Sequence, residues 1–171
     1  MIAPVFGKLE YDDGCSCWCG NLTIDFFGTE LGIKLMIQTS YEEVEDVRES
    51  QYTAYQQFMV HWPALQKPMA EAIIRYYYQD EYRFYGPDDE EEMKEWWPEI
   101  QTVDDLLEQI NLETLFIPPD YIMQDVYGGK RVLYLLFTHK WGNDMETNNN
   151  GIGVAFHNEE LHKIGFQDIA F

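Results

Sequence analysis

Hydrophobic and polar residues alternate along the first 38 residues of the chain, a pattern typical of antiparallel strands. Between residues 31 and 37 every second position is leucine or isoleucine, with a glycine, a lysine and a methionine in between. Successive side chains of a strand point to opposite faces, so this alternation predicts a sheet with one buried face. Asp12-Asp13-Gly14 and Gly28 supply turns between the predicted strands.

The spacing of hydrophobic residues then changes to three and four, which is the period of an amphipathic helix. Residues at these steps between Val44 and Trp62 predict a first helix, and Pro63 is its expected end. A second helix is predicted from Pro68, with Met69 and Tyr77 among its inward side chains.

The remaining third of the chain is predicted to contain one short helix and several strands. Thr102 and Asp105 have the spacing of a capping pair, which predicts a helix over residues 103–110. Strands are expected over residues 112–117, in a hairpin over residues 121–138, and in a last hairpin over residues 152–166.

Strands and helices are thus segregated along the chain, and no period of 20–50 residues repeats. We expect an α+β fold with a mainly antiparallel sheet, and two longer helices and one short helix packed on one of its faces. The length of 171 residues indicates one domain over residues 1–171, with an acidic loop at about residues 86–101.

Charge narrows the range of partners. The chain has 31 acidic and 11 basic residues, a formal net charge of −20 at pH 7. Phosphate binding requires clustered Lys and Arg, so nucleic acid is excluded as a direct partner. The excess of carboxylates also disfavours anionic membrane surfaces, and it favours a basic protein as partner.

The negative charge is concentrated in one segment. Residues 80–113 carry −11 of the net −20, and this segment contains two adjacent tryptophans. Carboxylates steer a basic partner and aromatic side chains provide binding energy, so we predict a partner-binding surface here. Alternatively, the tryptophans anchor the segment to the protein's own core and the carboxylates are only a solvated face. The predicted surface consists of Asp88, Asp89, Glu90, Glu91, Glu92, Glu95, Trp96 and Trp97.

The cysteines form one tight local group, Cys15, Cys17 and Cys19. Disulfide frameworks spread their cysteines along the chain, so this grouping favours a reducing compartment, the cytoplasm. The N-terminus has no secretory signal pattern, and no apolar run reaches the ~18 residues of a membrane span. Thiols two residues apart on an extended strand are roughly 6–7 Å apart, which is a poor spacing for binding one metal ion together. We therefore expect small buried hydrophobes, with no metal and no cofactor.

Two histidines and one glutamine are further candidates. His157 and His162 flank the last predicted turn and could face each other, and with Asp168 they would make a three-ligand metal set. A small metal-dependent enzyme using these histidines and nearby carboxylates is thus one alternative, and a structural oligomerisation module is another. Gln51 falls on the apolar side of the first helix, where its amide is expected to bond a strand backbone.

Motifs for nucleophilic catalysis are missing from the sequence. There is no G-x-S-x-G, and no serine has an adjacent histidine. A non-enzymatic role is therefore favoured.

Several short motifs, in their order along the chain, carry a resemblance to a known family. The chain resembles small acidic bacterial proteins of unknown function that are found among candidate immunity proteins of polymorphic toxin systems. The resemblance implies an α+β cytosolic protein without established catalytic residues, and a function as inhibitor of a basic toxin or nuclease. The motifs are Trp18-x-Gly20, Phe26-Phe27-Gly28, Gln51-x-x-Ala54-Tyr55-x-x-Phe58, Ala72-Ile73-x-x-Tyr76-Tyr77, Gly153-Val154-x-Phe156 and Gly165-x-Gln167-Asp168-Ile169.

Overall fold

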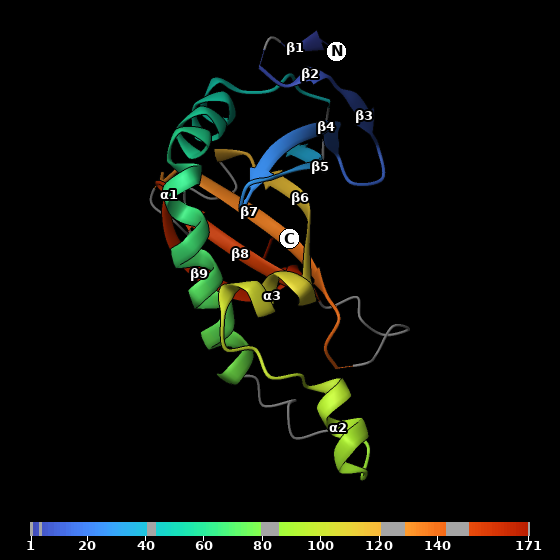
Figure 1. Cartoon of the computed structure of the whole chain (residues 1–171). Helices are drawn as coiled ribbons and strands as arrows, with labels where there is room; N and C mark the ends of the chain where they lie inside the picture. The colour runs from blue at the N-terminus through green and yellow to red at the C-terminus, as the bar shows by residue number, and fades with distance from the viewer. Residues whose placement is uncertain are drawn as a thin grey trace.

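The structure is a computed structural model that describes residues 5–40, 44–79, 86–120, 129–142 and 151–170, and the backbone of residues 2–3. Its centre is a seven-stranded sheet whose strands follow one another in chain order (Figure 1). The strands are β3 (Glu10–Asp12), β4 (Cys17–Phe26), β5 (Thr29–Gln38), β6 (Ile110–Ile117), β7 (Val132–His139), β8 (Ile152–His157) and β9 (Glu160–Phe166). Strands β1 (Ile2–Ala3) and β2 (Gly7–Lys8) form a separate antiparallel pair.

All neighbours in the large sheet are antiparallel except β5 and β6, which are parallel. A parallel pair requires a long crossover, and here the crossover contains every α-helix of the described residues. These helices are α1 (Glu49–Gln79), α2 (Glu90–Trp96) and α3 (Val103–Gln109), and a 3-10 turn, η2 (Gln167–Ala170), follows β9. The predicted α+β class with a mainly antiparallel sheet is therefore confirmed.

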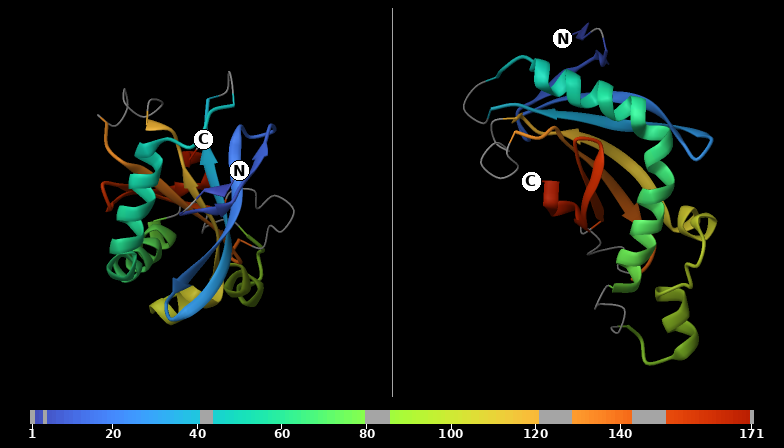
Figure 2. Two further views of the ribbon diagram at one scale, coloured as in Figure 1. Left: turned by 90° about the horizontal axis from the view of Figure 1, so that it is seen from above. Right: turned by 90° about the vertical axis from the view of Figure 1, so that its left-hand side faces the viewer.

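Helix α1 corrects the prediction of two helices separated at Pro63. It runs unbroken for 31 residues with Pro63 and Pro68 inside it. An interior proline costs about 3 kcal/mol, but both prolines lie on the exposed side, where the helix bends around the sheet (Figure 2). On the opposite side the buried stripe continues from Trp62 through Met69 to Tyr77. Burial of each such side chain contributes about 1.5–3 kcal/mol, which outweighs the two prolines.

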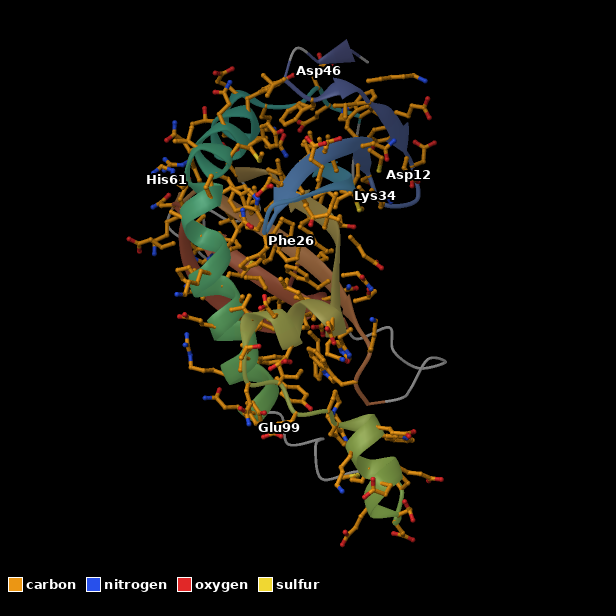
Figure 3. All side chains as sticks on the ribbon, viewed as in Figure 1. Asp12, Phe26, Lys34, Asp46, His61 and Glu99 are labelled. Atoms are coloured by element: carbon orange, nitrogen blue, oxygen red, sulfur yellow. The ribbon has the colours of Figure 1, made fainter. Side chains whose placement is uncertain are left out.

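The main core lies between α1, α3 and one face of the sheet. Alternate residues of β7, Leu133, Leu135 and Phe137, point into it, as the strand period requires. Trp62 of α1 stacks on Phe26 of β4 with ring centroids 6.2 Å apart. We call this side of the sheet the helix-covered face (Figure 3).

The other side of the sheet, which we call the opposite face, has a smaller core. It contains Cys17, Met36, Phe116, Val132, Tyr134, Leu136 and Ala155, with Ala170 packed on them. Turn η2 covers part of this face because β8 and β9 carry glycines there. A Cβ on Gly153 would lie 2.7 Å from the Ile169 side chain, and the Gln167 amide donates to the Phe137 carbonyl (2.8 Å). Two of the sequence motifs, the one that begins at Gly153 and the one that begins at Gly165, thus form the surface on which η2 packs, which we call the seat of η2.

Gln51 confirms its prediction. The side chain is buried, and its Nε2 donates to the carbonyls of Gln38 (2.8 Å) and Ile117 (3.3 Å). Its Oε1 accepts the backbone N–H of Arg48 at 3.1 Å. One amide thereby joins the start of α1 to the ends of the parallel strands β5 and β6.

From residue 102 onward, the described elements agree with the prediction. Thr102 and Asp105 form the predicted capping box of α3, and β8 and β9 form the predicted last hairpin. The expected strand over residues 121–127 lies outside the described residues. Among the described helices, none has an apolar stretch of the length that a membrane-spanning helix needs.

Candidate partner-binding site

The predicted acidic surface is a short helix projecting from the body of the protein. Residues 88–97, which we call the acidic arm, comprise α2, the two residues before it and Trp97. Asp89 is the N-cap, and its side chain accepts the backbone N–H groups of Glu91 (3.0 Å) and Glu92 (3.1 Å). The expected loop is therefore a capped helix, and Asp89 with Glu92 three positions later is the sequence signal for it.

Charge in the acidic arm is exposed. The arm contains six carboxylates and one lysine, and no residue of α2 is buried. Carboxylates in the first turn stabilise a helix by interacting with its dipole, which accounts for Glu90, Glu91 and Glu92. Glu95 lies in the last turn, where a negative charge opposes the dipole, so helix stability does not explain it.

Trp97 anchors the arm to the body. Its ring is half-buried against the main core, 6.2 Å from the Tyr77 ring and within 3.7 Å of where a Gly142 Cβ would stand. Tyr77 in turn packs 4.9 Å from the ring of Trp141, which is buried. The segment after the arm is tied to α1 as well, because the Tyr77 hydroxyl donates to the Pro98 carbonyl (2.6 Å).

Trp96 occupies a different position from its neighbour. Its carbonyl accepts the Gly142 N–H at 2.7 Å, while its half-buried ring stands beside Gly86, together with Met93 of the arm itself. The ring does not contribute to the main core. The two tryptophans are therefore unequal: Trp97 holds the arm, and part of Trp96 faces solvent.

The structure thus brings together all eight residues of the predicted surface. They lie at one end of the molecule, beyond the C-terminal end of α1 (Figure 1). Neither tryptophan is sealed in the core, and the carboxylates are not dispersed over unrelated regions. The carboxylates and the partly exposed Trp96 therefore lie on one projecting segment of the molecule.

The cysteines pack on the core of the opposite face, as expected of small hydrophobic residues, but they do not all lie on one strand. Cys17 and Cys19 are on β4, but Cys15 belongs to the turn before it, where Ser16 has a left-handed backbone (φ 53°). The turn folds Cys15 back toward the strand. Burial raises the pKa of the Cys19 thiol to about 11 against the opposing effect of Lys34, and burial raises the pKa of Cys17 further. The premise of three thiols on one extended strand is therefore wrong.

His157 and His162 do face each other, as predicted. Their rings stack at 3.7 Å between centroids with 18° between the planes. The register between β8 and β9 shifts at Ala155 and Phe156, which is a β-bulge close to the two rings. Burial, followed by the charges of His162 and Lys130, lowers the pKa of His157 to about 4.

Asp168 does not complete a metal set with these histidines. Among the described residues, the group of three or more possible ligands with atoms within 4.8 Å of one another is Asp12, Cys15 and Cys19. Asp12 has no signal of its own in the sequence, because its position beside the cysteines depends on how β3 pairs with β4. The pairing of Asp12 with Cys17 places its side chain on the cysteine side of the hairpin.

Comparison with known proteins gives one result. Curated proteins and solved structures return no significant match. A family model described as a domain of unknown function, DUF6985, matches residues 5–171, nearly the whole chain. The chain therefore belongs to the DUF6985 family.

Proposed function

We propose that this protein binds a basic protein partner through the acidic arm and blocks it without carrying out a reaction itself. The observation that carries the proposal is a helix with no buried residue and six carboxylates in and beside it, fixed to the body at one end. The resemblance to candidate immunity proteins supports a toxin or nuclease as the partner.

The carboxylates act mainly on the encounter between the two proteins. The side chain of Glu91 is 83% exposed, and its ion pair with Lys94 is a surface contact that contributes little to stability. Charge at such positions attracts a cationic surface over about one Debye length, roughly 8–10 Å at physiological salt. Association faster than about 10⁶ M⁻¹s⁻¹ and decreasing with salt is the expected signature.

Trp96 is the aromatic contact in this proposal. Tryptophan is enriched among the residues that contribute most of the binding energy of protein interfaces. Its contribution is large where atoms of the partner exclude water from the ring. The ring of Trp96 is already half-covered by Gly86 and Met93, so little conformational freedom is lost on docking. Trp97 is a positioning residue, because it packs on Tyr77 and fixes where α2 projects.

The experiment uses the purified products of the genes on either side of this one, because a toxin and its inhibitor are expected to be encoded together. Association and dissociation rates are measured at low and physiological salt for the wild type and for Glu91→Lys/Glu92→Lys/Glu95→Lys. We expect at least one basic neighbour product to bind, and the triple variant to associate at least about tenfold more slowly. These three positions leave the Asp89 cap intact.

A matched control carries the same change in net charge elsewhere. Glu30→Lys/Glu108→Lys/Glu160→Lys alters three exposed carboxylates outside the arm. If this control slows association as much as the arm variant does, net charge and not the arm is responsible. The proposal also fails if no neighbour product binds the wild type.

A further inference from the structure

The hairpin of β3 and β4 brings three metal-ligating side chains together at the end of the molecule away from the acidic arm (Figures 1 and 3). The ligand atoms of Asp12, Cys15 and Cys19 lie within 4.8 Å of one another. Asp12 comes from β3, Cys15 from the turn, and Cys19 from β4. They converge because the turn over residues 13–16, in which Ser16 has a left-handed backbone, reverses the chain between Asp12 and Cys17.

The ligand types indicate which ion fits. Two thiolates and one carboxylate are a donor set for Zn²⁺, which binds sulfur at about 2.3 Å and carboxylate oxygen at about 2.0–2.2 Å. Ca²⁺ and Mg²⁺ prefer oxygen donors throughout, so the two sulfurs disfavour them. A tetrahedral ion of this size requires its ligand atoms roughly 3–4 Å apart, so adjustments of side-chain rotamers within the cluster suffice.

The cluster is accessible to solvent, and hydrogen bonds stabilise the turn that carries it. Asp12 is exposed, while Cys15 and Cys19 are half-buried against the core of the opposite face. The Oδ1 atom of Asp12 accepts the Gly14 N–H at 2.9 Å, and its second carboxylate oxygen is available for a metal. The buried Cys17 thiol donates to the Cys15 carbonyl at 3.1 Å, and this hydrogen bond stabilises the conformation of the turn.

We propose that the Asp12 carboxylate and the Cys15 and Cys19 thiolates form a Zn²⁺ site, with the fourth tetrahedral position open to solvent. The proton of each thiol passes to solvent as its sulfur–zinc bond forms, so each ion that binds releases two protons. The bound ion links the short edge strand β3 to β4 and stabilises this end of the sheet. This site is independent of the partner-binding role of the acidic arm.

The test titrates Co²⁺, as a spectroscopic probe for Zn²⁺, into the metal-free full chain kept reduced by a phosphine. We expect one Co²⁺ per chain, a near-ultraviolet thiolate-to-cobalt absorption band, and loss of that band when Zn²⁺ is added. Loss of even an indirect partner of a metal ligand costs about 10–100-fold in affinity. Cys15→Ser and Cys19→Ser should therefore each weaken Co²⁺ binding at least about tenfold.

Two exposed positions give a matched pair that leaves the core unchanged. Asp12→Asn keeps an oxygen for the Gly14 N–H but removes the carboxylate ligand, so Co²⁺ should bind several-fold more weakly. Asp13→Asn removes the same charge one residue later, outside the cluster, and should bind like the wild type. This pair decides the question even if a cysteine variant does not fold.

The proposal is wrong if the reduced wild type shows no thiolate-to-cobalt band. It is also wrong if both serine variants keep wild-type affinity, or if Asp13→Asn weakens binding as much as Asp12→Asn. Cys17→Ala checks the assignment of ligands, since loss of the band in that variant alone would place the metal on a different set of sulfurs.

Discussion

The two faces of the sheet differ in what covers them and in the chemistry they carry. The helix-covered face is packed by α1 and α3 with aliphatic and aromatic side chains, among them Phe58 and Trp62. The opposite face has a smaller core, and the described structure places only η2 and the β3–β4 turn over it. The cysteines and the buried His157 are on the opposite face. These cysteines and His157 therefore lie where the described structure has no long helix over the sheet.

The acidic arm belongs to neither face. It is joined to the body through Trp97 and through the Pro98 carbonyl, which accepts the hydroxyl of Tyr77. The fold is therefore stabilised in one region and charged in another.

The largest expected effect tests whether packing on the helix-covered face contributes most of the free energy of unfolding. Phe58 is fully buried, with its ring 5.3 Å from Trp62 and 5.4 Å from Phe156 of β8. Truncation leaves a cavity between helix and sheet, so Phe58→Ala should lower the free energy of unfolding by about 3–5 kcal/mol. Urea unfolding followed by tryptophan fluorescence measures this change.

Val60→Ala is the control on the same helix. Val60 is 72% exposed, so its truncation should change the free energy of unfolding by less than about 0.5 kcal/mol. Similar losses at both positions would mean that α1 does not depend on its contact with the sheet, and the contrast between the faces would no longer hold.

Those features of the fold that depend on interactions between residues close in the sequence could be predicted from the sequence. Alternation marked the strands, and the pair Thr102 and Asp105 marked the start of α3. Gln51 was predictable because an amide on an apolar helix side must find partners, and it bonds two strand carbonyls. These features depend on a few neighbouring residues, and the fold confirms each of them.

The features that were missed depend on contacts between distant residues. Pro63 and Pro68 stop a helix by local rules, but the packing of one side of α1 along the sheet overrides them. The parallel pairing of β5 with β6 joins residues 34–37 to residues 114–117 across the whole helical crossover. The cluster of Asp12 with Cys15 and Cys19 requires both the hairpin register and the left-handed Ser16.

A change of pH acts on the opposite face. The pKa of His157 is about 4 in the folded protein and 6.5 in a solvated histidine, so the unfolded chain binds more protons between these values. The free energy of unfolding should therefore fall as the pH drops from about 6.5 to about 4, by at most about 3 kcal/mol. Thermal unfolding at intervals of half a pH unit measures this slope.

His157→Phe should flatten this slope, because phenylalanine fills the buried site without a titrating group. His61→Phe removes an exposed histidine and should leave the slope unchanged. If the free energy of unfolding of His157→Phe still falls with pH in the same way, other groups cause the pH dependence. His157 would then not account for a difference between the two faces.

The smallest expected effect concerns the seat of η2 on the opposite face. A Cβ on Gly153 would lie 2.7 Å from Ile169 and 2.9 Å from the Phe166 carbonyl, so η2 and β9 must shift. Gly153→Ala should lower the free energy of unfolding by about 1–3 kcal/mol, as overpacking does. Gly32→Ala is the matched control, since it also lies in a strand and its Cβ meets nothing within 4 Å. Alanine restricts the unfolded chain more than glycine does, so this control should be neutral or slightly stabilising. Equal effects at the two positions would mean that η2 does not pack closely on Gly153 and that its contact contributes little to the stability of the opposite face.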